Sequence, residues 1–400
     1  MRRALLALPL LFFAVHAAYL PFTLDDIDAI NFAMGVRDFD VSKHQPHPPG
    51  YPVFIALGKL STAVFGAVGI PAAEVRGLAI WSALSGAVLL PLLFWLYREL
   101  TRDDTVAIWA AIVTVVSPLF WFNALRPLSD LTGLAMVVLT QLLLVTIILR
   151  RPPPADAPRR LVVAAFVAGL AMGLRSQSLV LTLPLLGLAL VVAGSRLRGK
   201  DRLRGATAVA GGALVWAIPL LIASGGLEPY MVALGSQAGE DFSGVVMLWT
   251  ARTARVAIDA IRYSFLWPWG SVAAGWIVTV MAVAGAVRMI RAAPASLATL
   301  LVAFVPYGVF HLLVQETLTT RYALPLLIPV AGLAVYGLGS LGRYAVHGGC
   351  AALAAWSLVV TLPAAWNYGR HPAPHTSALR DALATPAASV KCPAAPARSG

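Results

Sequence analysis

Carboxylates are concentrated in one short stretch of the chain. Five of the 18 acidic residues lie in LDDIDAINFAMGVRDFDVSKHQPHPPGYP, residues 24–52, directly after an apolar run. A carboxylate at a membrane boundary, where partial desolvation raises its basicity, can act as a general base, and Asp25 and Asp26 are the candidates. The alternative is structural: Asp25 would cap the next helix, while Asp26 and Asp28 would favour its positive end.

Two arginines are candidates for holding an anion. Arg175 lies in the GLRSQS break between two short apolar runs, and no acidic residue is close to it in the sequence. Arg321 lies in QETLTTRY, between Glu316 and Tyr322. The guanidinium fork matches phosphate oxygens, so both residues are predicted phosphate contacts. Snorkelling of a helix-end arginine towards water is the alternative interpretation.

Two histidines stand among prolines in KHQPHPPGYP. His44 and His47 have no acid between them, whereas a metal site would prefer further carboxylate ligands nearby. The Pro-Pro-Gly sequence favours a rigid turn that positions the next helix. No cofactor is firmly implied by the sequence, and a divalent metal is left open. Nucleotide-binding and hydrolase fingerprints are missing from any credible context.

The composition decides which elements position these side chains. Hydrophobic residues make up 59% of the 400 residues and charged residues 12%, with a mean hydropathy of +0.79. Apolar runs near the ~20 residues that cross a bilayer predict an all-α polytopic membrane protein. We expect about 11 transmembrane helices, with juxtamembrane helices on the outer face. The spans are predicted at roughly 4–21, 77–97, 105–122, 131–149, 160–174, 178–194, 206–224, 271–288, 295–314, 322–341 and 348–366.

The charge distribution sets the orientation. The net charge of +12 falls almost entirely in segments on one side, which the positive-inside rule assigns to the cytoplasm. We therefore expect a plasma (inner) membrane protein with a cytoplasmic N-terminus and an extracytoplasmic C-terminus. This requires residues 51–69 to form an interfacial helix rather than a span. The N-terminal run is read as a retained first helix, with a cleaved signal peptide as the alternative.

The domain organisation follows from these spans. Residues 1–366 form one transmembrane domain, with a first outer loop at 22–76 and a long outer loop at 225–270. Within the latter, 248–265 shows an amphipathic helical pattern with arginines on one face. Ser129 or Asp130 is read as the cap of the fourth span. The Ala/Pro-rich segment 367–400 is expected to be a mobile extracytoplasmic tail.

Several of these segments resemble the GT-C glycosyltransferases, which include protein O-mannosyltransferases and the lipid A aminoarabinose transferase. The resemblance rests on a first span, then DD, then HPPGYPVFIALGKLSTAVFG and AAEVRGLAIWSALSGAVLLPLLFWLYREL. GLAMGLRSQSLVLTLPLL and TRYALPLLIPVAGLA are similar to two further family segments. These short motifs are spread over most of residues 1–340. A family C-terminal extracytoplasmic domain has no counterpart here.

The resemblance implies an inverting transfer of sugar from a polyprenyl-phosphate donor to a hydroxyl on an envelope glycan, lipid or protein. It implies Asp25 as catalytic base, Asp26 as the second acid, and Arg175 and Arg321 as phosphate contacts. The further candidate substrate-binding residues are Tyr322, His44, His47 and Glu316. Partners would be the donor, the acceptor and membrane lipids, with no nucleic acid. The competing hypotheses are a secondary transporter or lipid flippase, and a non-catalytic scaffold.

Overall fold

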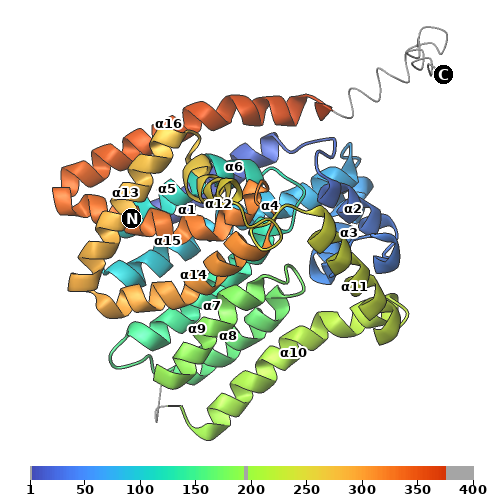
Figure 1. Cartoon of the computed structure of the whole chain (residues 1–400), viewed down its shortest axis with the longest axis horizontal. Helices are drawn as coiled ribbons and strands as arrows, with labels where there is room; N and C mark the ends of the chain where they lie inside the picture. Colours follow the sequence, from blue (N-terminus) through green and yellow to red (C-terminus); the bar gives the residue numbers. More distant parts are fainter. Residues whose placement is uncertain (1, 193–196, 375–400) are drawn as a thin grey trace, which may run out of the picture.

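The computed structural model describes residues 2–192 and 197–374, and within these ranges its secondary structure is helical. An isolated β-bridge joins Asp40 to Gln45. The expected all-α class is confirmed (Figure 1). Of the expected mobile tail, 375–400 lies outside the described residues. The last long helix, however, continues to Arg370, past the predicted end of the final span.

Long helices run between the two ends of the bundle. They are α1 (Arg2–Ala18), α4 (Ala73–Thr101), α5 (Asp104–Val116), α7 (Asp130–Leu149), α8 (Ala157–Ala171), α9 (Ser178–Val192), α10 (Gly199–Ala223), α13 (Val272–Ala292), α14 (Pro294–Val314), α15 (Leu324–Leu338) and α16 (Arg343–Arg370). Seven helical segments in the described ranges are long and apolar enough to cross a bilayer, and others are shorter. The chain is a multi-pass membrane protein, and the number of about 11 spans stays a prediction.

The third expected span is not one continuous helix. α5 ends at Val116, and the short helix α6 (Pro118–Asn123) follows it. Pro118 forces the break, because its ring excludes a helical conformation at the preceding residue, and Ser117 has an extended ψ of 140°. The prediction of one span over 105–122 was therefore wrong at its outer end.

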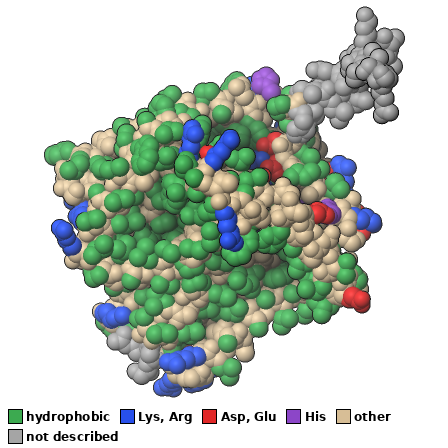
Figure 2. All heavy atoms as spheres, viewed as in Figure 1, with side chains coloured by type: hydrophobic (Ala, Val, Ile, Leu, Met, Phe, Trp, Pro, Cys, Tyr) green, Lys and Arg blue, Asp and Glu red, His purple; other side chains and the backbone are tan. Residues whose placement is uncertain are grey.

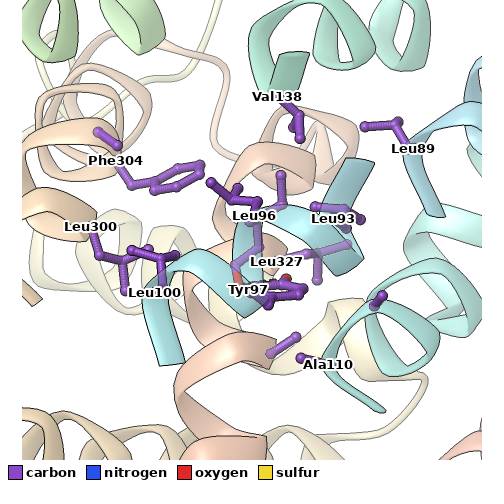
Figure 3. Packing of buried hydrophobic residues seen from close by; sticks show 14 of the residues in the cluster. Leu89, Leu93, Leu96, Tyr97, Leu100, Ala110, Val138, Leu300, Phe304 and Leu327 are labelled. Atoms are coloured by element: carbon purple, nitrogen blue, oxygen red, sulfur yellow. Dashed lines mark hydrogen bonds between the residues drawn. The ribbon is translucent and has the colours of Figure 1, made fainter. Parts of the chain in front are cut away.

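The core of the bundle is apolar but contains a satisfied polar group. Tyr97 of α4 is 1% exposed and packs among Leu93, Leu327 and their neighbours (Figure 3). Its hydroxyl lies 2.9 Å from the Ile328 carbonyl oxygen, to which it donates, and 2.8 Å from the Thr114 hydroxyl. A buried hydroxyl without such partners would be costly, so these bonds fix the register of α4 against α5 and α15.

Two helices of the first outer loop lie at one end of the bundle, together with α11 (Leu227–Gly244) (Figure 1). They are α2 (Ile27–Arg37) and α3 (Pro52–Ala67), separated by the short helix η1 (Val41–Lys43). The backbone amide of Val53, in α3, donates to the Gly173 carbonyl at 3.1 Å, just beyond the end of α8. The C-terminal half of α3 packs on the first turns of α4, where Gly77 lies against Thr62. This placement fits the interfacial helix, which stays a prediction.

The long outer loop differs from the predicted helix over 248–265. Residues 245–253 are not helical, and α12 covers only Ala254–Ile261. The cause is local: Thr253 caps α12 by accepting from the Val256 amide, and the Trp249 amide donates to the Leu313 carbonyl instead of continuing a helix. A π-helical turn, η3 (Arg262–Leu266), and a 3-10 turn, η4 (Trp267–Trp269), follow.

Candidate active site

Four carboxylates and three arginines meet at the end of the bundle that carries α2 and α3. We call them the acid–arginine cluster: Asp25, Asp26, Asp28, Asp130, Arg126, Arg175 and Arg321. They come from the α1–α2 connection, the α6–α7 connection, the GLRSQS break and the turn η5 (Thr320–Ala323) before α15. All are helix-end positions, because a charge inside the hydrocarbon region is costly. The cluster brings together four predicted site residues and three that were not predicted.

Arg126 holds the two adjacent aspartates. Its Nη2 lies 2.8 Å from Asp26 Oδ2, and its Nε lies 3.2 Å from Asp25 Oδ2. The Tyr368 hydroxyl, from the end of α16, donates to Asp25 Oδ1 at 3.0 Å. Burial opposes the charge of Arg126, but the two carboxylates outweigh it and raise the pKa of this guanidinium. Both aspartates are thus oriented by a shared cation.

The helix-capping role that the sequence suggested for Asp25 is filled by Asp26. Asp26 is the N-cap of α2, and its Oδ1 accepts from the Asp28 amide at 2.9 Å. Its φ of −138° and ψ of 145° are the extended values of a cap residue. The expectation that Asp25 would be the cap was wrong, because the helix begins one residue later. Asp25 is therefore free of a capping role.

Arg321 is the centre of the cluster. Its Nη2 forms a close ion pair with Asp28 and lies 3.8 Å from Asp26 Oδ1, while its Nη1 lies 3.7 Å from Asp130 Oδ2. Only 7% of its side chain is exposed. Its Nε and Nη1 are buried without a hydrogen-bond acceptor in the described part of the chain. Buried N–H groups are normally hydrogen-bonded, so these two donors have room for acceptor oxygens of a ligand.

Arg175 has an acidic partner that the sequence did not reveal. Its Nη1 lies 3.0 Å from Asp130 Oδ2, and Asp130 is 5% exposed. Burial opposes the charge of Arg175, but Asp130 outweighs it and raises the pKa of the guanidinium. α7 does begin at Asp130, as predicted, but neither Ser129 nor Asp130 supplies a side-chain cap. The expectation of an arginine without an acid was wrong, because Asp130 approaches from a different helix.

The other predicted residues are divided between the cluster and its surroundings. The ring of Tyr322 packs against both Arg175 and Arg321, whose Cζ atoms lie 5.4 and 5.1 Å from its centroid. His47 joins the cluster at its edge, with Nε2 3.7 Å from Asp28 Oδ1.

His44 and Glu316 lie outside the cluster. His44 ends the turn η1 in the left-handed conformation, with φ 58°. Glu316 accepts a hydrogen bond from the Thr319 hydroxyl. In residues 2–192 and 197–374, no group of three or more His, Cys, Asp or Glu side chains is arranged to hold a metal.

A cavity of about 440 Å³ opens beside the cluster. Its lining includes the charged residues Asp26, Arg126 and Arg321 and the apolar residues Trp267 and Leu318. Asp25 is not among the lining residues, but it contacts Arg126, which is. A space lined by both charged and apolar side chains suits an amphipathic substrate.

His47 is a mostly buried histidine at the edge of the cluster. Burial lowers the pKa of His47, although the Asp28 carboxylate partly opposes this. The folded state therefore binds a proton less readily than the unfolded state, so stability is expected to fall as the pH drops below about 6.5, the ordinary His value.

His47→Gln should reduce this pH-dependent loss of stability, measured as the decrease in unfolding temperature between pH 7.5, 6.5 and 5.5. His371→Gln, at an exposed histidine, should leave the wild-type slope; equal slopes for wild type and His47→Gln would contradict the assignment.

Tyr368 contacts Asp25 and was not among the residues predicted from the sequence. The only sequence signal was a tyrosine at the end of the last apolar run. The α16 end is tied to the α1–α2 connection, since the Ala373 amide donates to the Thr23 hydroxyl at 2.9 Å. Arg126, Asp28 and Asp130 were also missed as site residues, although each is a charged residue next to a predicted span or turn.

Tyr368→Phe should lower about tenfold the rate of any reaction in which the Asp25 carboxylate takes a proton, the equivalent of one hydrogen bond to a charged group. The expected loss is in kcat with KM nearly unchanged, because the phenol contacts Asp25 and does not line the cavity. Initial rates against substrate concentration would test this. Tyr344→Phe, at a 93% exposed tyrosine of the same helix, is the control. A change in KM alone would show that Tyr368 acts on substrate binding instead.

The chain is similar to known proteins in part of its sequence and in its fold. Residues 41–198 match the family described as protein O-mannosyl-transferase TMEM260 N-terminal domain. A search of curated protein sequences finds no match.

Solved structures extend the similarity over most of the chain. ArnT from Cupriavidus metallidurans bound to undecaprenyl phosphate has 13% identity and a TM-score of 0.55, over 86% of this chain and 61% of ArnT. The Archaeoglobus fulgidus oligosaccharyltransferase tethered with an acceptor peptide has 13% identity and a TM-score of 0.55, over 95% of this chain and 56% of that protein. This chain thus spans about three fifths of their lengths. At such identities the similarity shows the fold, and the resemblance to GT-C glycosyltransferases is confirmed.

Proposed function

We propose that this GT-C glycosyltransferase-like protein transfers a sugar from a polyprenyl-phosphate donor to an acceptor hydroxyl at the extracytoplasmic membrane face. The observation that carries the proposal is the acid–arginine cluster beside the cavity, in which Nε and Nη1 of Arg321 are buried without a hydrogen-bond acceptor among the described residues. A base and a phosphate-binding cation within one site are the parts that this transfer needs. The ArnT and oligosaccharyltransferase structures that share the fold were solved with undecaprenyl phosphate and dolichol phosphate, respectively.

The donor phosphate would lie against Arg321. Two N–H-bearing atoms of this guanidinium have no acceptor among the described residues, and Arg321 and Arg126 both line the cavity. As the sugar leaves, negative charge accumulates on the lipid phosphate, and a fixed cation stabilises it more than it stabilises the bound donor. Arg175 would contribute through Tyr322 and Asp130, which fix the position of Arg321. Among the other candidates, His47 would position Asp28, and His44 and Glu316 would bind substrate only by moving towards the cavity.

Asp25 would act as the base, with Asp26 as the second acid. The acceptor hydroxyl gives its proton to the Asp25 carboxylate, its oxygen bonds to the anomeric carbon, and the bond from that carbon to the phosphate oxygen breaks. The lipid phosphate leaves with the electron pair. A single displacement of this kind inverts the anomeric centre. Tyr368 and Arg126 hold the Asp25 carboxylate from two sides, which fits the orientation that a base requires.

The location of the cluster favours this function over a transporter. Transporters commonly bind their substrate near the bilayer midplane, between broken helices. The cluster instead lies at one end of the bundle, on the connections before α2, α7 and α15. Arginine-rich connections such as 150–156 lie at the other end, which fits a cytoplasmic location for that end and an inner membrane protein with an extracytoplasmic C-terminus.

Comparison of the cell-envelope glycans of a deletion strain and its complemented strain tests the proposal. The deletion should remove one sugar from a glycan, lipid or protein, and the intact gene should restore it. The lost sugar and the molecule that carried it would identify donor and acceptor. Envelope glycans that are unchanged in the deletion, together with accumulation of a lipid-linked sugar in one leaflet, would support a flippase instead.

A further inference from the structure

A second charged cavity lies at the end of the bundle opposite the acid–arginine cluster. Its volume is about 280 Å³, and three arginines line it: Arg102, Arg288 and Arg343. Asp103 is the acidic residue among the lining residues, and its carboxylate already accepts from the Thr105 and Val106 amides as the N-cap of α5. Arg102 also pairs with Glu99, whose Oε2 lies 3.3 Å from its Nη1, so Arg288 and Arg343 supply the excess positive charge of the lining, which also includes Thr101 and Thr105.

Arg288 is built into this cavity rather than left to move freely. Its Nη1 donates to the Tyr336 carbonyl at 2.6 Å, and its guanidinium lies 4.4 Å from the centroid of the Tyr336 ring. A Cβ at Gly339 would come within 2.8 Å of the same Nη1, so the glycine provides room for the guanidinium. Packing of this kind fixes a cation in place, which lowers the entropic cost of binding an anion.

An apolar groove lies next to this cavity. It has a volume of about 540 Å³ and is lined by α5, α13, α15 and α16, which lie side by side in Figure 1. Leu338 lines the groove and the next residue, Gly339, lines the charged cavity. On α16, Arg343 lies in the cavity and Trp356 at the far end of the groove. At 1.5 Å per residue they are about 20 Å apart, close to the ~15 Å of hydrocarbon in one leaflet.

We propose that the charged cavity and the groove together form a binding site for an anionic phospholipid. The headgroup phosphate would be held by Arg288, Arg343 and Arg102, and an acyl chain would lie along the groove towards Trp356. Basic pockets between helix ends are suited to anionic headgroups, and a free phosphate ion would leave the groove without a ligand. The site is separate from the acid–arginine cluster and does not depend on the proposed function.

Native mass spectrometry of the purified full chain in detergent tests the headgroup half of the site. The probes are phosphatidylglycerol, phosphatidylcholine with the same acyl chains, and inorganic phosphate. Phosphatidylglycerol should bind at least tenfold more tightly than phosphatidylcholine, and Arg343→Gln should remove about tenfold, the equivalent of one charge-assisted hydrogen bond. The control is Arg291→Gln. Arg291 is an exposed cation near Arg288 at the C-terminal end of α13 and does not line the cavity, so this variant should retain the wild-type affinity.

A second pair of variants tests the groove. Ala352 is exposed and lines the groove, whereas its neighbour Ala351 is exposed and does not. Ala352→Trp should weaken phosphatidylglycerol binding while Ala351→Trp does not, with both proteins folded as judged by their thermal unfolding. Equal binding of the two lipids, equal losses in Arg343→Gln and Arg291→Gln, or displacement of the lipid by inorganic phosphate would each overturn the proposal. An effect of Arg343→Gln with no effect of Ala352→Trp would overturn the groove as the acyl-chain site.

Discussion

Asp25→Asn is expected to lower the rate of sugar transfer about 10²–10⁴-fold, the usual contribution of a general base. The amide is nearly isosteric with the carboxylate and can still accept from the Tyr368 hydroxyl, which donates to Asp25 at 3.0 Å. It cannot take a proton from the acceptor. The measurement is the initial rate of transfer from a polyprenyl-phosphate sugar in detergent, together with the envelope glycans of a deletion strain that expresses the variant at wild-type abundance.

Asp26→Asn and Asp38→Asn are the matched variants. Asn is as good an N-cap as Asp, so Asp26→Asn should keep α2 intact while removing a charge from the cavity wall. Asp38 is an exposed carboxylate beyond α2, and its amide variant should transfer at the wild-type rate. A well-folded Asp25→Asn with normal transfer would remove Asp25 from the role. If only Asp26→Asn lost activity, the base would be the carboxylate that lines the cavity.

Arg321→Ala is expected to have the largest effect on stability as well as on donor binding. The change leaves the buried Asp130 without one cation and Asp28 without its close ion pair, and breaking a buried pair commonly costs about 3–5 kcal/mol. It also removes the donors that would face the donor phosphate. Thermal unfolding should shift to lower temperature, and binding of a polyprenyl phosphate measured by calorimetry should be lost.

Arg321→Lys separates the two effects. The ammonium group keeps the positive charge among the carboxylates, so most of the stability should be retained, but it cannot form the paired bonds of a guanidinium. Donor affinity should then fall about tenfold or more while the protein stays folded. Arg291→Ala, at an exposed position of the opposite end, is the control for loss of charge alone. Unchanged donor affinity in Arg321→Lys and in any folded Arg321→Ala would exclude Arg321 as a phosphate contact.

The site could be predicted from the sequence only as far as its separate parts. Hydropathy marked Asp25, Arg175 and Arg321 as charged residues at the ends of apolar runs, and the structure places all three in the cluster. Side-chain periodicity was less informative in the long outer loop. There, an apolar stripe predicted a helix from residue 248, but the helix begins only at Ala254. Figure 2 shows basic side chains over the part of the surface where α12 lies.

The sequence by itself determined that this protein is helical and multi-pass and that its carboxylates and arginines lie outside the apolar runs. Those properties depend on hydropathy, which acts locally along the chain. Only the tertiary structure decided which charges meet. Asp130 reaches Arg175 across two helices, and Tyr368 reaches Asp25 from 343 residues away. The physical reason is that an ion pair needs atoms within a few ångströms, and helix packing, rather than spacing along the chain, sets those distances.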